Sequence, residues 1–163
     1  MTGSKGAPGR PPALVIGLGN EYRGDDAVGL VVARRLREAA PESVRVLEES
    51  GEGAALIESW QGADFVILID AVYLGAKPGT IHRFDAHVQP IASKFFRFST
   101  HDFGVAQAVE LARALGRLPP RLIVYGVEGK SFEAGVGLSP EVEAAAQEVV
   151  ERVLAELGSP PLI

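Results

Sequence analysis

The stretch Ala13-Leu14-Val15-Ile16-Gly17-Leu18-Gly19-Asn20-Glu21-Tyr22-Arg23-Gly24-Asp25-Asp26-Ala27-Val28-Gly29 predicts a strand, a glycine-rich turn and the start of a helix. Its first four residues are apolar and bounded by Pro12 and Gly17, which is typical of a short buried strand. After the turn, apolar residues recur at helical spacing. They are Val28, Val31, Val32, Leu36 and Ala39.

Two consecutive carboxylates, Asp25 and Asp26, stand where the predicted helix begins. Acidic side chains are favourable at the positive end of a helix, so from position alone charge placement is the commoner explanation, ahead of metal binding. A dinucleotide site is disfavoured, because Gly17-x-Gly19 lacks the third glycine and two negative charges would repel a pyrophosphate. We interpret Asp25 as helix-start electrostatics and Asp26 as a candidate metal ligand.

The rest of the chain alternates between strand and helix patterns. Strands are expected at residues 44–47, 65–70, 80–84 and 122–125, and helices after residue 53, after a cap at Ser99 or Thr100, and from Ser139-Pro140 onward. The strands at 65–70 and 80–84 are joined by a turn too short for a crossover helix, so we expect them to be antiparallel. The sequence therefore predicts an α/β fold: one three-layer domain with a mixed, mostly parallel sheet of about five strands and helices on both faces.

Composition limits the class of protein. The chain has 163 residues, no cysteine and a formal net charge of −5, which excludes disulfides and thiolate metal sites and disfavours nucleic acid as a partner. No segment is long and apolar enough for a signal peptide or a membrane span. We expect a monomeric cytoplasmic protein with a disordered tail at residues 1–12, one domain at 13–158 and a short tail at 159–163.

Three polar residues are expected to meet at the carboxyl edge of the sheet. Asp26 follows the first strand, Asp70 ends the third, and His101 stands at the start of the helix expected near Thr100. In open α/β sheets ligands collect at this edge. Each residue alone also has an ordinary structural explanation. Together, two carboxylates and one imidazole suit zinc, nickel or another divalent first-row ion and leave positions open for water or substrate.

Other candidates for chemistry are weaker. We interpret His82, in a predicted strand, and His87, in a loop, as surface residues, and Glu128 as a surface or helix-interacting acid. A serine-hydrolase nucleophile elbow, Gly-x-Ser-x-Gly, does not occur in the sequence.

The ordered set of motifs resembles the nickel–iron hydrogenase maturation endopeptidases. The matching pieces are Gly17-Leu18-Gly19-Asn20, Gly24-Asp25-Asp26-x-x-Gly29, Ile69-Asp70-Ala71, Ser99-x-His101-x-x-Gly104, Gly126-Val127 and Gly137-Leu138-Ser139-Pro140. The resemblance implies a cytoplasmic, aspartic-type endopeptidase that removes a C-terminal extension from the hydrogenase large-subunit precursor after nickel insertion. It implies that Asp26, Asp70 and His101 contact the metal and serve catalysis, the nickel being carried by the precursor.

The chain departs from the family pattern at a metal-contacting position, in the turn after the second strand, and after His101, which is followed by Asp102-Phe103. The first ligand position is often glutamate in the family, whereas Asp26 has a shorter reach. The usual Gly-Gly-Thr turn after the second strand is replaced by Ser50-Gly51-Glu52-Gly53. Two rival functions remain open at this point: a non-cleaving checking or carrier protein for the same precursor, and a peptidyl-tRNA hydrolase, which shares only the Gly-Leu-Gly-Asn turn.

Overall fold

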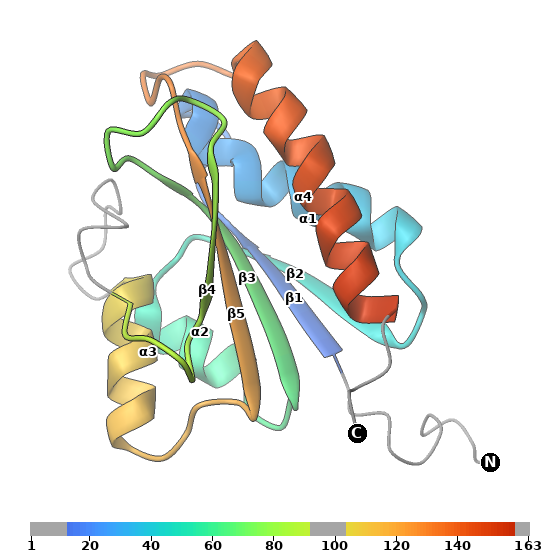
Figure 1. The fold of residues 1–163 in the computed structure, drawn as a ribbon, viewed down its shortest axis with the longest axis vertical. Coiled ribbons are helices and arrows are strands. Elements are labelled where there is room, and N and C mark those ends of the chain that lie inside the picture. The colour runs from blue at the N-terminus through green and yellow to red at the C-terminus, as the bar shows by residue number, and fades with distance from the viewer. Residues whose placement is uncertain (1–12, 92–103, 159–163) are drawn as a thin grey trace.

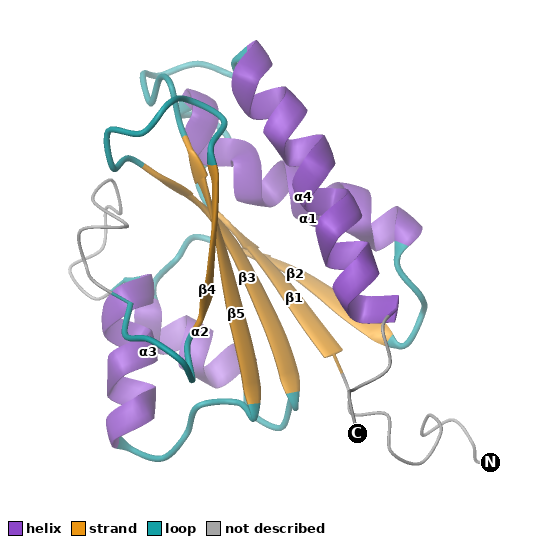
Figure 2. Cartoon of the chain, in the orientation of Figure 1, coloured by secondary structure: helices purple, strands orange, loops and turns teal. Residues whose placement is uncertain are grey.

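The computed structural model describes residues 13–91 and 104–158, which form a five-stranded sheet between two layers of helices (Figures 1 and 2). The strands are β1 (Ala13–Leu18), β2 (Val44–Glu49), β3 (Phe65–Val72), β4 (Ile81–Asp85) and β5 (Arg121–Glu128). The helices are η1 (Gly24–Ala27), α1 (Val28–Ala39), α2 (Gly53–Ser59), α3 (Val105–Ala114) and α4 (Pro140–Gly158). The expected tails at 1–12 and 159–163, the caps Ser99 and Thr100, and His101 lie outside the described residues.

The sheet has the strand order β2-β1-β3-β5-β4, and all pairs are parallel except β4 with β5. The predicted mixed, mostly parallel sheet is therefore confirmed. β4 runs antiparallel to β3 as expected, but β5 lies between them, so the two strands are not neighbours. The β3–β4 turn therefore spans a neighbouring strand rather than closing a hairpin.

Helices cover both faces of the sheet because its central strands are apolar on both sides. Along β3, the residues facing one side pack with α1 and α4, and those facing the other pack with α2 and α3 (Figure 1). The first set is Phe65, Ile67, Ile69 and Ala71; the second is Val66, Leu68 and Val72. Burial on both faces is typical of central strands in parallel sheets.

The chain reverses its direction of travel across the sheet between β1 and β3. From β1 it moves outward to β2, and then returns past β1 to β3. The helices that follow β1 and β2 accordingly lie on opposite faces of the sheet (Figure 1). Such a switch point opens a crevice at the carboxyl ends of the two strands, which is the usual ligand position in open α/β folds.

Candidate active site at the sheet switch point

Asp26 and Asp70 come from the two strands that flank the switch point. β1 and β3 pair in parallel up to Gly17 opposite Ile69, so Asp70 stands one residue beyond that pair. Asp26 follows β1 in η1, which contacts β3. Figure 1 places the ends of β1, β3 and β5 and the start of α1 at the same end of the sheet. The predicted convergence of these two acids at one edge is supported by this topology.

Two glycines let α1 descend onto the strand ends. A Cβ on Gly29 would lie 2.3 Å from the Ile69 carbonyl oxygen and 2.4 Å from that of Leu18. A Cβ on Gly17 would lie 2.1 Å from the Gly29 carbonyl oxygen. No side chain larger than that of glycine fits at either position. The two glycines therefore set how closely α1 and η1, with Asp26, approach the sheet.

The Asp26 carboxylate is half-buried and held by the turn that precedes it. Its Oδ2 accepts a hydrogen bond of 3.0 Å from the Asn20 backbone N–H. Burial raises the pKa of Asp26, while the Asn20 hydrogen bond and the positive charge of Arg23 act in the opposite direction. Among the residues that the structure describes, the carboxylate is thus oriented from one side and has no direct ion pair.

The Asp70 carboxyl group has a pKa well above its ordinary value. Burial is the largest cause, and the negative charge of Asp26 is the next; one hydrogen bond from Ala71 N–H, 2.8 Å long, opposes them. Two desolvated carboxyl groups that repel each other can relieve the repulsion by binding a cation or by retaining a proton. The two acids together can therefore attract a positive charge, which the position of either acid alone would not indicate.

Asp25 has a different role from the one expected. It is 1% exposed, and its carboxylate accepts hydrogen bonds from the backbone N–H groups of Lys130, Ser131 and Ser139 at 2.8, 3.0 and 2.8 Å. The Ser139 hydroxyl donates to it as well. Burial alone would raise the pKa of Asp25, but these hydrogen bonds together hold it below its ordinary value. The interpretation as helix-start electrostatics is wrong: Asp25 fastens η1 to the β5–α4 loop.

Glu128 is also not the surface acid that was expected. It ends β5 with no exposed side-chain area, and its Oε2 accepts hydrogen bonds from Leu74 and Gly75 N–H at 2.7 and 3.1 Å. Its Oε1 lies 3.3 Å from Nε2 of His82. His82 is accordingly a partly buried partner rather than a free surface residue. Glu128 anchors the loop that follows β3 and so shapes the same edge of the sheet.

The third predicted ligand, His101, lies outside the described residues, four positions before the first residue of α3. Within residues 13–91 and 104–158, no group of three His, Cys, Asp or Glu residues is arranged to hold a metal ion. Sequence reasoning also passed over Glu49, which ends β2 at this edge. Its Oε2 accepts a hydrogen bond from the Ser59 hydroxyl, whereas its buried Oε1 has no partner among the described residues.

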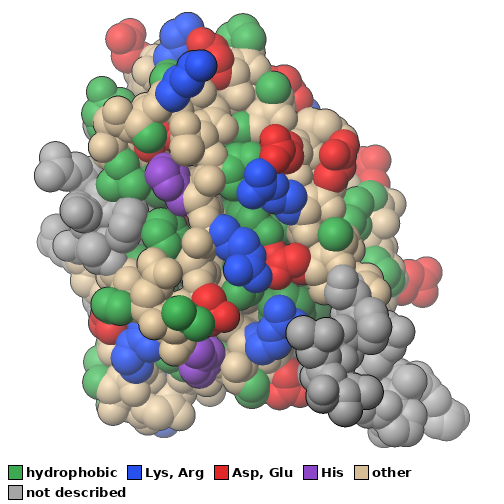
Figure 3. Space-filling view, viewed as in Figure 1, with side chains coloured by type: hydrophobic (Ala, Val, Ile, Leu, Met, Phe, Trp, Pro, Cys, Tyr) green, Lys and Arg blue, Asp and Glu red, His purple; other side chains and the backbone are tan. Residues whose placement is uncertain are grey.

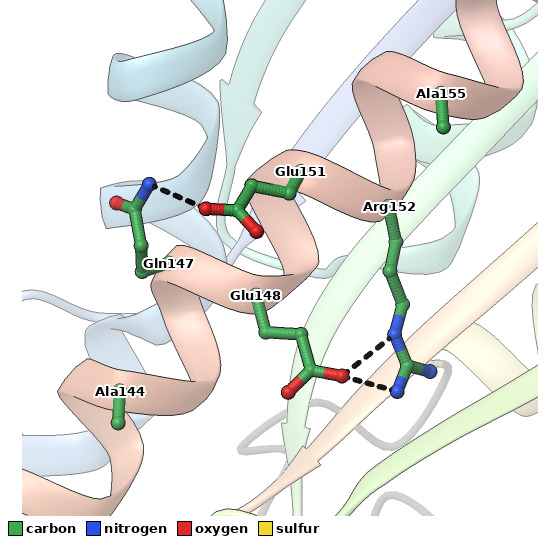
Figure 4. A pocket seen from close by; sticks show the side chains of 6 residues that line it. All are labelled: Ala144, Gln147, Glu148, Glu151, Arg152 and Ala155. Carbon is green, nitrogen blue, oxygen red and sulfur yellow. Dashed lines mark hydrogen bonds and ion pairs between the residues drawn. The ribbon is translucent and has the colours of Figure 1, made fainter.

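The hollow on the outer side of α4 is not a competing site. It is lined by a single helix, and its polar side chains pair with one another through Gln147–Glu151 and Arg152–Glu148 contacts (Figure 4). On the face drawn in Figure 3, acidic and basic side chains lie close together along α4. None of the helices in the described parts is long and apolar enough to span a membrane.

The fold and the acid pair define a class: a doubly wound α/β protein with paired carboxylates at its switch point. Residues 30–156 match the family model of the hydrogenase maturation proteases, and the chain belongs to that family. It is 32% identical over 148 residues to the hydrogenase 2 maturation protease of Escherichia coli K12, covering 88% of this chain and 89% of the relative. The resemblance stated from the motifs is confirmed.

Solved structures agree with this assignment. The solution structure of an endopeptidase from Escherichia coli superposes with a TM-score of 0.77 at 32% identity and covers 89% of this chain and 91% of that one. The hydrogenase maturating endopeptidase HybD from Escherichia coli gives a TM-score of 0.74 at 29% identity, with the same coverage. The protein is therefore a hydrolase of the endopeptidase type. Both rival functions, the non-cleaving carrier and the peptidyl-tRNA hydrolase, lose their support.

Proposed function

We propose that this endopeptidase removes the C-terminal extension of a nickel–iron hydrogenase large-subunit precursor, and that cleavage requires nickel already seated in the precursor. The observation that carries the proposal is the pairing of Asp26 with Asp70 at the switch point, in a member of the hydrogenase maturation protease family. Two partly desolvated carboxylates form a site that gains most from an incoming cation.

In this proposal the metal belongs to the substrate, and the chain supplies oxygen ligands to it. Asp26 and Asp70 contact the nickel, and His101 completes the set with an imidazole nitrogen, a combination that divalent first-row ions accept. The contact places the scissile peptide bond of the precursor beside the same acids. Hydrolysis then adds water across that bond, leaving a carboxylate on the mature subunit and an amine on the released peptide. Zinc, which accepts the same ligand types, is the alternative occupant.

The proposal extends to the setting of the reaction. We expect the enzyme to act as a monomer in the cytoplasm, where the nickel-loaded precursor is its partner. The negative net charge of the chain gives no basis for binding nucleic acid. The absence of cysteine is compatible with a reducing compartment.

The decisive experiment compares precursor loaded with nickel and precursor without it. Each is incubated with the wild-type protein and with the Asp26→Asn, Asp70→Asn and His101→Ala variants, and the mass of the precursor is measured before and after. We expect the wild type to shorten only the loaded precursor and the three variants to shorten neither. Equal cleavage of both forms would overturn the nickel requirement, and an unchanged mass in every sample would overturn the proposed cleavage itself.

A further inference from the structure

Three large apolar side chains are exposed on the loops around the acid pair. They are Tyr22 at 65%, Tyr73 at 45% and Val136 at 80% exposure, and we call them the rim patch. They lie on the β1–η1, β3–β4 and β5–α4 loops, which gather at one end of the sheet (Figure 1). Hydrophobic side chains reach the surface at that end in the space-filling view (Figure 3). The acids are thus bordered by apolar surface.

Backbone hydrogen bonds hold Tyr22 and Val136 on neighbouring segments. The Gly135 N–H donates to the Tyr22 carbonyl at 2.9 Å, and the Gly24 N–H donates to the Gly135 carbonyl at 2.9 Å. Arg23 and Gly135 form a parallel bridge between these two bonds. The buried Asp25 carboxylate fastens the same two loops to each other, as described above. The two apolar side chains are therefore presented on a paired, pre-organised backbone rather than on independent loops.

An aromatic contact brings the third loop into this assembly. The ring of Tyr73 meets the ring of Phe132 edge-on, with the centroids 6.0 Å apart and an angle of 87° between the planes. Phe132 belongs to the β5–α4 loop and packs over Gly129, where an added Cβ would lie 2.5 Å from its ring. Tyr73 still leaves nearly half of its surface open.

The rim patch is continuous with the candidate site along the chain. Tyr22 precedes Asp26 by four residues, and Tyr73 follows Asp70 by three. A macromolecule that brings a metal ion to these two acids must therefore cover the loops on either side of them. Clustered exposed apolar side chains around a site mark protein contacts, and tyrosine is enriched among the residues that carry binding energy in interfaces.

We propose that the rim patch is the docking surface for the hydrogenase large-subunit precursor, which places an apolar surface bordering its cleavage region on Tyr22, Tyr73 and Val136. This inference rests on the proposed function, since it takes its occupant from the substrate that the acids receive. Docking is then separate from metal contact: the patch supplies affinity for the folded precursor, and Asp26 with Asp70 tests whether nickel is present.

The chain offers matched controls for testing this surface. Val88 is 77% exposed and Leu115 is 58% exposed, values close to those of Val136 and Tyr22, and neither residue lies on the three rim loops. The test compares the double variant Tyr22→Ser/Val136→Ser with the control Val88→Ser/Leu115→Ser. For each protein we would measure the melting temperature, KM and kcat for the nickel-loaded precursor, and the Kd for a precursor with a blocked cleavage bond.

We expect the rim variant to raise KM and Kd by roughly tenfold, as loss of interface anchors does, with kcat unchanged. The control should match the wild type in KM, kcat and Kd, and both variants should have the melting temperature of the wild type. An unchanged KM and Kd in the rim variant would overturn the proposal. So would a wild-type dimer in sedimentation that the rim variant dissociates, because the patch would then join two copies of this chain.

The two proposals fail in different ways. If the wild type binds the blocked precursor through the rim patch but leaves the native precursor at full length, the docking surface stands and the cleavage proposal falls. If the wild type cleaves the precursor and the rim variant does so with the same KM, cleavage stands and the docking surface falls. If the wild type neither binds nor cleaves the precursor, both are overturned.

Discussion

At the residue scale, Asp25 and Asp26 show how neighbouring identical side chains acquire opposite properties. Asp25 is buried against three backbone N–H groups and a hydroxyl, and its pKa is lowered. Asp26 is half-buried and accepts from one N–H donor within the described part of the chain, and its pKa is raised. The number of hydrogen-bond donors, rather than burial, decides the sign. The first acid therefore serves structure and the second is left available for a cation.

Replacing Asp70 by Asn should make the protein more stable and inactive. The raised pKa of Asp70 means that its ionised carboxylate destabilises the folded state relative to the unfolded state. The destabilisation is about 1.4 kcal/mol for each unit by which the pKa is raised. Asn removes the charge and can still accept the Ala71 N–H. Because the penalty exists only where the group is ionised, the gain should be present at neutral pH and should fade as the pH drops through the raised pKa.

Thermal unfolding of the wild type and of Asp70→Asn, measured from about pH 3 to about pH 8, tests this prediction, since that range includes the ordinary pKa of Asp. A melting temperature that is lower in the variant at neutral pH would contradict the assignment of Asp70 as a destabilised acid. Loss of precursor cleavage in the more stable protein would separate function from folding, a trade-off that active-site residues commonly make.

Replacing Asp25 by Asn should destabilise the protein. The side-chain NH₂ of the introduced asparagine would face at least one of the N–H groups that now donate to the Asp25 carboxylate, which would leave buried donors unpaired. We therefore expect the free energy of unfolding to fall by about 2–4 kcal/mol. Because the folded pKa is lowered, the stabilisation by Asp25 is present above its ordinary pKa and is lost as the pH falls. The difference in the free energy of unfolding between wild type and variant, measured with urea, should therefore be smaller near pH 3 (roughly one unit below the ordinary pKa) than at neutral pH.

A suitable control for that measurement is Asp85→Asn. Asp85 is half-buried and accepts a single local hydrogen bond from His87 N–H at 2.9 Å. Its replacement should change the free energy of unfolding by much less. A similar loss in both variants would mean that the clamp to the β5–α4 loop has no special weight.

At the element scale, local patterns predicted most of the strands and helices, but not their neighbours. The short apolar runs of β1 and β3 were sufficient because both faces of these strands are buried. The place of β5 between β3 and β4 could not be read from the connection, since a short turn defines only the relative direction of two strands. The later strand β5 pairs with β3 over its whole length and displaces β4 to the edge.

The close approach of α1 to the sheet predicts that Gly29→Ala destabilises the protein. Helix propensity alone favours alanine by up to about 1 kcal/mol. The new Cβ would however lie 2.3 Å from the Ile69 carbonyl oxygen, so α1 has to move away from β3, and we expect a net loss of about 1–3 kcal/mol. Asp26 would move with the helix, so cleavage should fall as well.

Gly158→Ala is the matched control for that substitution. Gly158 is the last residue of α4, and nothing lies within 4 Å of an added Cβ. This variant should be as stable as the wild type or slightly more stable in chemical denaturation. If Gly29→Ala were equally neutral, the tight contact between α1 and the ends of β1 and β3 would not be a requirement of the fold.

At the scale of the whole molecule, the candidate site was predictable as far as topology determines it. Strand ends in a parallel sheet share one edge, so Asp26 and Asp70 could be brought together from the sequence. The clamp at Asp25 and the anchor at Glu128 could not, because their backbone N–H partners lie 53 or more positions away in the chain, in loops without a pattern. His101 remains a prediction, since it lies outside the described residues.

Besides its pairing with β5, the edge strand β4 is linked to α4 by an ionic network, and loss of that network should weaken the fold in a pH-dependent way. Arg83 of β4 donates to Glu156 of α4 through Nε and Nη2 at 3.1 and 2.7 Å, and the Tyr125 hydroxyl of β5 donates to the same carboxylate. Burial opposes ionisation of Glu156, but the Arg83 and Tyr125 hydrogen bonds outweigh it and lower its pKa. Burial and Glu156 raise the pKa of Tyr125 to about 12.

These two shifts define the pH range in which the network stabilises the molecule. Because the pKa of Glu156 is lowered in the folded state, its ionised form stabilises the fold above the ordinary carboxyl pKa, and this stabilisation is lost as the pH falls. Because the pKa of Tyr125 is raised, its neutral form stabilises the fold below the ordinary phenol pKa, and this stabilisation is lost as the pH rises toward about 12. Glu156→Gln should therefore lower the free energy of unfolding by about 1 kcal/mol at neutral pH, since Arg83 is partly exposed to solvent. The gap between variant and wild type in urea unfolding should close in acid, and a gap that is constant with pH would mean that Glu156 acts through packing and not through its charge.

Because the network lies away from the switch point, the same variant should cleave precursor with an unchanged KM, which makes it a test of whether stability and docking are independent in this fold.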